Sequence, residues 1–153
     1  MSGAVSAETL REYFEEWLAV MQTELDRFLD VLPESVARAL DESAASLDVL
    51  EAWLLERYPS TEALIEGSEA EILDGAARYV GETFLGQLGG RWSISAEDPQ
   101  DVNYKLPIIT GFKGEFSRLS PVTMVTAAAD RRSGTYLSTI LRNVQRRAAA
   151  GQP

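Results

Sequence analysis

Four residues near the middle of the chain could do chemistry together: Arg78, Tyr79, Glu82 and Trp92. A carboxylate beside a guanidinium and a phenol could act as a general base or hold a small polar ligand. The alternative is a structural role, in which Glu82 pairs with Arg78 or Arg91 or accepts a hydrogen bond from the Trp92 indole. We favour the structural role, because structural ion pairs outnumber catalytic carboxylates.

The residue types that the sequence lacks restrict the chemistry further. It contains no cysteine and no histidine, which excludes disulfides, thiol nucleophiles, thiolate zinc sites and every serine–histidine arrangement. It also has no Walker-type loop, no GxSxG and no dinucleotide fingerprint. We therefore expect no cofactor, and we lean against an enzyme.

Two short motifs carry weak chemical signals. Residues 111–114 spell GxxG, the loop that clamps nucleic acid in KH domains, but here it follows a strand pattern and favours a hairpin turn. Hard oxygen ligands for calcium occur at four positions: Glu97, Asp98, Asp101 and Asn103. Their spacing lacks the glycine and the terminal glutamate of an EF-hand loop, so we expect no metal site.

Charge is distributed unevenly along the chain. Residues 1–75 hold 18 acidic and 4 basic side chains, a net charge of −14, whereas residues 76–153 hold 6 acidic and 10 basic ones, a net charge of +4. The total of −10 makes nucleic acid an unfavourable partner, because its phosphates are bound by lysine and arginine. A basic protein partner suits this charge better. Its candidate binding residues are Glu12, Glu15, Glu16, Glu24 and Asp26.

A basic cluster near the end of the chain comprises Arg131, Arg132, Arg142, Arg146 and Arg147. These side chains could bind an acidic partner. We expect instead that part of the cluster lies against the acidic helices of the chain or solvates the last helix, where positive charge complements the helix dipole.

Apolar residues recur at helical spacing from Leu10 to Leu32, which predicts one long helix capped by Ser6 and ended by Pro33. Six of them follow heptad spacing: Phe14, Leu18, Met21, Leu25, Phe28 and Leu32. This stripe, at residues 14–32, should pack lengthwise on another helix, either within the chain or in a second copy as a homodimer.

Further helices are predicted in the middle of the chain. A short turn at residues 34–40 precedes a second long helix that ends before Pro59, and Ser60 could cap a brief turn. The stripe of that second helix contains Leu47, Leu50, Trp53, Leu54 and Tyr58. Ser68 and Glu71 form a capping box, which predicts that a third long helix begins there.

The third helix carries the segment YVGETFLGQLGGRW at residues 79–92. A glycine inside a helix costs about 1 kcal/mol relative to alanine. Gly75, Gly81 and Gly86 therefore predict that another element approaches this helix closely. Gly89 and Gly90 should end it as a left-handed cap.

After Gly90 the apolar period changes to that of strands. Strands are predicted at residues 92–95 and 104–110, the latter at an edge or with a bulge because of Pro107, with a short third strand at 115–119. Ser120 and Pro121 begin a helix that runs to Arg132, and a last helix follows. The order of helices, a small antiparallel sheet and helices predicts an α+β fold.

We expect one domain, with an acidic helical part at 1–66, an α+β part at 67–147 and a frayed tail at 148–153. The first residues do not read as a secretory signal, and no apolar run approaches the roughly 18 residues that cross a bilayer. We therefore expect a cytoplasmic protein without a membrane partner.

The block formed by the YxGE segment, the Gly89–Gly90 pair, Trp92, the strand around Pro107 and the Ser120–Pro121 helix start resembles one in small bacterial α+β proteins of uncharacterised function. Some of these proteins are suspected immunity proteins of toxin systems. The resemblance covers residues 68–135 and implies an α+β fold. It brings no established catalytic residues to this chain.

Two functions are consistent with the sequence. The favoured one is a non-enzymatic interaction protein, of the immunity or adaptor type, that binds a basic partner through the acidic helical face. The alternative is a small-ligand-binding or hydrolytic domain whose pocket surrounds Glu82. A pocket that faces Glu82 would favour the second function.

Overall fold

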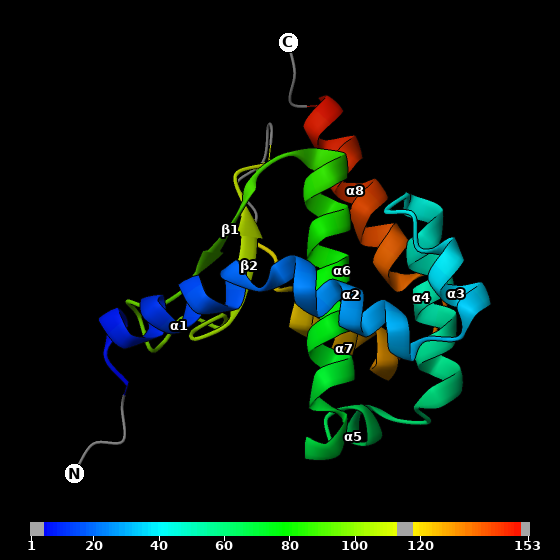
Figure 1. Ribbon diagram of the computed structural model, residues 1–153. Coiled ribbons are helices and arrows are strands. Elements are labelled where there is room, and N and C mark those ends of the chain that lie inside the picture. Colours follow the sequence, from blue (N-terminus) through cyan, green and yellow to red (C-terminus); the bar gives the residue numbers. More distant parts are fainter. Residues whose placement is uncertain (1–4, 113–117, 151–153) are drawn as a thin grey trace.

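A computed structural model describes residues 5–112 and 118–150 of the chain and has the expected α+β fold (Figure 1). In chain order, its elements are α1 (Ala7–Ala19), α2 (Met21–Val31), α3 (Glu34–Ala39), α4 (Ala44–Arg57), α5 (Thr61–Leu64), the 3₁₀ turn η1 (Gly67–Glu69), α6 (Ala70–Leu88), β1 (Arg91–Ile94), β2 (Pro107–Thr110), α7 (Pro121–Arg131) and α8 (Tyr136–Ala150). None of the helices in the described part is long and apolar enough to cross a membrane.

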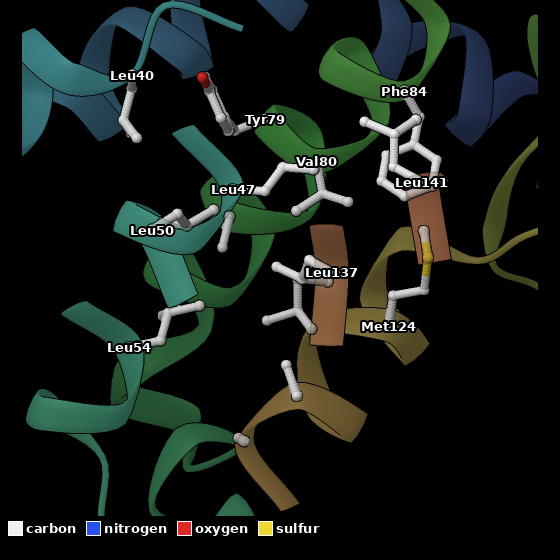
Figure 2. Packing of buried hydrophobic residues seen from close by; sticks show 14 of the residues in the cluster. Leu40, Leu47, Leu50, Leu54, Tyr79, Val80, Phe84, Met124, Leu137 and Leu141 are labelled. Carbon is white, nitrogen blue, oxygen red and sulfur yellow. The ribbon is translucent and has the colours of Figure 1, made fainter. Parts of the chain in front are cut away.

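The core surrounds α6, which stands at the centre of the molecule with α4, α7 and α8 on one side and α2 across another (Figure 1). Leucines of α4 meet Val80 of α6 and Leu137 of α8 in the layer shown in Figure 2. Burying one such leucine contributes about 2 kcal/mol. Completely buried apolar side chains include Leu47, Leu50, Leu64, Val80, Phe84, Ile109, Val125, Leu137 and Leu141.

The predicted single N-terminal helix is wrong, because the structure divides it into α1 and α2 at Val20. The Val20 backbone has φ −103° and ψ 16°, outside the helical region. The two helices have different main contacts: α1 packs on β1 and is hydrogen-bonded to α6 through Trp17 near its end, whereas α2 packs along α6. A straight helix would have to present one stripe to both supports, and the heptad spacing of the sequence does not reveal that difference.

Of the two partners expected for the heptad stripe, the structure contains the internal one. Leu25, Phe28 and Leu32 of the stripe belong to the main core and are almost completely buried. Phe28 lies directly over Gly75 of α6, where a Cβ atom would overlap its ring. The chain itself therefore covers the part of the stripe that a second copy would need.

Most predicted helix starts are confirmed, and one is wrong. Ser6, Ser60 and Ser120 each accept a hydrogen bond from a backbone amide of the first turn that follows. Ser68 does not cap α6, because it lies within η1 and donates its hydroxyl to Glu69. The helix continues from this tighter turn at Ala70, so it needs no separate side-chain cap.

The sheet pairs β1 with β2 in antiparallel register, with Trp92 opposite Ile109 and Ile94 opposite Pro107. The second strand is shorter than predicted, because Tyr104 makes only an isolated bridge to Ser95 across a loop. Of the expected third strand, residues 115–117 lie outside the described residues, as do 113 and 114 of the GxxG motif. Leu119 pairs with Ile109 on the far side of β2.

Helix α7 begins at Pro121, as predicted, and the expected last helix is α8. Leu137, Leu141 and Val144 of α8 are buried. The helix continues to Ala150, so residues 148–150 of the expected frayed tail are helical, and residues 151–153 lie outside the described residues.

Candidate functional site

Close approach to α6 occurs at two of the three glycines inside it. A Cβ atom on Gly81 would overlap the Trp92 indole, as one on Gly75 would overlap Phe28. The expectation is wrong for Gly86, which has open space around it. At the end of the helix, Gly89 and Gly90 have φ values of 77° and 101°, which favour glycine.

Trp17 of α1 is fixed to α6 by Asp74 and Arg78. Its indole Nε1 donates to Asp74 Oδ1 at 2.8 Å, and Arg78 Nε donates to Asp74 Oδ2 at 2.7 Å. The Arg78 guanidinium also donates to the Trp17 carbonyl and lies 4.1 Å from the centre of the Trp17 ring. Only 3% of the Arg78 side chain is exposed, so its charge depends on these contacts.

Trp92 of β1 extends this arrangement along the same face of α6. Its indole donates to Glu82 Oε2 at 2.8 Å, which is one of the three partners expected for Glu82. The two indoles meet edge to face, with their ring centres 4.9 Å apart. We call Trp17, Asp74, Arg78, Glu82 and Trp92 the tryptophan clasp. It holds α1 and β1 against one face of α6.

Tyr79 is not part of the clasp, although the sequence placed it in the same candidate pocket. Its hydroxyl accepts from the Glu42 amide and is 2.7 Å from Ser46 Oγ, near the start of α4. Figure 2 shows it beside Leu40, with its oxygen directed away from the leucine layer. Burial raises the pKa of this phenol. The structure therefore brings Arg78, Glu82 and Trp92 together and separates them from Tyr79.

The polar atoms of the clasp are directed at one another. The nearest cleft runs between α1 and β1; Trp92 lines it, but Glu82 does not. An ion pair and hydrogen bonds within the chain already use Arg78, and the Trp92 indole uses one Glu82 oxygen. This arrangement suits joining elements better than binding or activating a substrate.

A buried carboxylate that the sequence analysis did not single out caps α8. Glu51 of α4 is completely buried and accepts from the Tyr136 amide at 3.0 Å and the Leu137 amide at 2.9 Å. One turn earlier, Asp48 accepts from the Ser138 hydroxyl at 2.6 Å. The positive end of the α8 dipole favours both carboxylates. A glutamate in the middle of an apolar helical stripe is the signal that could have revealed it.

Arg132 makes the reverse connection, from α7 to the end of α4. Its backbone is left-handed, with φ 57°, and its guanidinium donates to the Leu55 carbonyl at 2.7 Å and the Tyr58 carbonyl at 3.0 Å. Part of the basic cluster thus lies against the acidic helical part, as expected. Its contact, however, is with backbone carbonyls and not with acidic side chains. Arg131 stacks on Tyr136, with 5.0 Å between its guanidinium and the ring centre.

Tyr58, Arg57 and Glu69 form a second hydrogen-bonded group, at the end of α4. The Tyr58 hydroxyl donates to Glu69 at 2.5 Å and accepts from Arg57 at 3.0 Å. Burial, followed by the hydrogen bond to Glu69, raises the pKa of Tyr58 to about 12. A phenol with this pKa stays neutral at neutral pH and is unsuited to act as a base.

In the acidic loop at residues 97–103, the Asp101 carboxylate is hydrogen-bonded within the chain. Asp101 accepts from the Asn103 amide, the Ser95 hydroxyl and Arg118. These hydrogen bonds, in that order of importance, lower its pKa to about 2. Within residues 5–112 and 118–150, no group of acidic side chains is arranged to hold a metal ion.

The acidic face of α1 is different, because its carboxylates have no such partners. Glu12, Glu15 and Glu16 are exposed on the side of α1 opposite Phe14 and Trp17. In the part of the chain that the structure describes, none of the three has a hydrogen-bond or ion-pair partner. On α2, the two further candidates are engaged: Glu24 pairs with Arg27 at 3.2 Å, and Asp26 accepts from Gln22 at 2.8 Å.

No family model, curated protein or solved structure matches this chain. Any proposal for the function of this chain therefore has to rest on the arrangement of its own side chains. Two groups compete: the tryptophan clasp, whose polar atoms contact one another, and the α1 acidic face, which we define as Glu12, Glu15 and Glu16. Only the second group presents its chemistry to the surroundings.

Proposed function

We propose that this protein is a non-enzymatic interaction protein, of the immunity or adaptor type, that binds a basic partner through the α1 acidic face. One observation carries the proposal: these three carboxylates lie together on one face of a single helix, exposed and with no hydrogen-bond or ion-pair partner among the described residues, whereas Glu51, Asp74 and Asp101 are bound within the chain.

Like charges grouped on one helix face disfavour the helix by a few tenths of a kcal/mol per pair. The tryptophan clasp offsets this, because it holds α1 in place through Trp17. The α1 acidic face is therefore presented on a fixed element. Its negative field would attract a basic partner and raise the rate of association.

Charge reversal of the face tests the proposal. The variant Glu12→Lys/Glu15→Lys/Glu16→Lys should lose capture of a basic protein from a lysate of the native host, with captured proteins identified by mass spectrometry. The wild-type complex should also weaken as salt rises from about 0.05 to 0.5 M, because screening acts on exposed charges.

A control variant matches the change in net charge. Glu56, Glu62 and Glu66 are exposed on α4 and around α5, away from α1, so Glu56→Lys/Glu62→Lys/Glu66→Lys alters the total charge equally. Capture should survive in this control. Equal loss in both variants would mean that only the overall charge matters, and unchanged capture in the α1 variant would contradict the proposal.

A further inference from the structure

The free edge of β1 lies beside α1, and a groove separates them. One wall consists of Arg11, Phe14, Glu15 and Leu18 of α1, and the other of Trp92, Ser93 and Ile94 of β1. Side chains alternate between the two faces of a strand. Because three successive β1 residues line the groove, which has a volume of about 350 Å³, it follows the strand edge and not one face of the sheet.

The hydrogen bonds of the sheet show which backbone groups face this groove. Ile109 directs both its amide and its carbonyl to Leu119, at 2.8 and 3.0 Å. It therefore cannot bond Trp92, the residue opposite it in β1. Because bonded and non-bonded pairs alternate in an antiparallel ladder, the amides and carbonyls of Trp92 and Ile94 point away from β2.

The next non-bonded pair agrees with this assignment, since Ile94 lies opposite Pro107, which has no amide to donate. Among the described residues, neither Trp92 nor Ile94 makes a backbone hydrogen bond to a segment outside the sheet. The β1 edge thus presents two donors and two acceptors at the spacing of a partner strand.

The charges along the groove indicate what kind of strand would suit it. Of the α1 acidic face, Glu15 lines the groove, whereas Glu12 and Glu16 lie further round the helix. Among the described residues, none of the three carboxylates has a hydrogen-bond or ion-pair partner. Arg11 is paired with Glu97. The guanidinium of Arg91 lies towards Gly111, on the β2 side, so it does not neutralise the groove.

We propose that this groove binds an extended basic segment of the partner, which adds to the free edge of β1 as an antiparallel or parallel strand and places its cations against Glu15 and its neighbours. Backbone hydrogen bonds to Trp92 and Ile94 would supply the register, and the α1 acidic face would select the charge. The inference rests on the proposed function and names the form of its partner.

A synthetic peptide can test this form directly. The probe is acetyl-(Lys-Val)₄-amide, titrated into ¹⁵N-labelled protein and followed by NMR. Its matched control is the same peptide N-methylated at two adjacent central residues, one on each strand edge, which keeps the charge but blocks central pairing. The parent should shift the Trp92 and Ile94 amides and slow their hydrogen exchange, and it should bind about tenfold more tightly than the control, as expected for one or two lost hydrogen bonds.

A protein variant addresses the same edge. Ile94→Pro removes an amide that faces the groove and pairs with nothing in β2, and proline is accepted at strand edges. The folded variant, checked by circular dichroism, should bind both peptides equally weakly. Undiminished preference for the parent peptide would overturn the inference even if the variant lost stability.

The outcomes separate this inference from the proposed function. Equal binding of both peptides, abolished by Glu12→Lys/Glu15→Lys/Glu16→Lys, would overturn strand addition and leave the acidic-face proposal intact. Edge protection that survives charge reversal would support strand addition and contradict the acidic-face proposal. Absence of binding by the parent peptide at millimolar concentration would overturn the inference, whereas the lysate capture would still decide the proposed function.

Discussion

The junction between α4 and α8 and the outer face of α1 both contain glutamates on helices. These glutamates differ in burial and in hydrogen bonding. Glu51 is completely buried at the junction and accepts two backbone amides. Glu12, Glu15 and Glu16 lie exposed with no partner in the described residues. The comparison shows that the acidic residues of this chain have different roles. Some hold secondary-structure elements together, and others remain exposed to solvent and available to a partner.

The largest effect should come from removing the buried carboxylate. Glu51→Ala would leave two amides at the start of α8 without acceptors and a cavity beside Leu47 and Leu137, and we expect a loss of about 3–4 kcal/mol in the free energy of unfolding. Urea denaturation followed by circular dichroism would measure it. A loss below about 1 kcal/mol would show that the buried Glu51 carboxylate does not stabilise the junction between α4 and α8.

A smaller, pH-dependent effect should follow from Asp101→Asn. The folded-state pKa of Asp101 is lowered from 3.8 to about 2, so its contribution is complete above about pH 4 and is lost as the pH falls through about 2. The melting temperatures of wild type and variant should therefore differ at pH 6 and converge towards pH 2.5. Scanning calorimetry across this range would check it, and a constant difference would contradict the role of the carboxylate charge.

The smallest effect on stability should come from the α1 acidic face. Glu12→Gln/Glu15→Gln/Glu16→Gln removes repulsion between like charges and no contact, so the free energy of unfolding should change by no more than about 0.5 kcal/mol, towards stabilisation. Urea denaturation would measure this alongside Glu56→Gln/Glu62→Gln/Glu66→Gln. A strong destabilisation would show that the face is structural, as the junction is.

Features set by neighbouring residues could be predicted from the sequence. The caps by Ser6, Ser60 and Ser120 depend on hydrogen bonds three residues away, and the glycine cap of α6 depends on local backbone geometry. The need for close approach at Gly81 was also visible, because a glycine inside a helix has a cost. The group that approaches Gly81 is the Trp92 indole, and this indole was also one of the partners that the sequence predicted for Glu82.

Features set by distant residues could not be predicted in the same way. The division at Val20 reflects the different supports of α1 and α2, and the amides that Glu51 caps are more than 80 residues away in sequence. The separation of Tyr79 from Arg78 also has this origin: adjacent residues project about 100° apart on a helix, and each side of α6 meets a different element. The candidate pocket was inferred from residues that are close in sequence. In the structure these residues belong to two separate contacts, on different sides of α6.

The edge-to-face contact of Trp17 and Trp92 also makes the molecule its own optical probe. The two rings come from α1 and β1, and their centres are 4.9 Å apart, close enough for their excited states to couple. The remaining tryptophan, Trp53, lies on α4 beside Arg57. The near-ultraviolet signal that depends on the Trp17–Trp92 pair therefore reports whether α1 is docked, so its release from the body could be timed in an unlabelled chain.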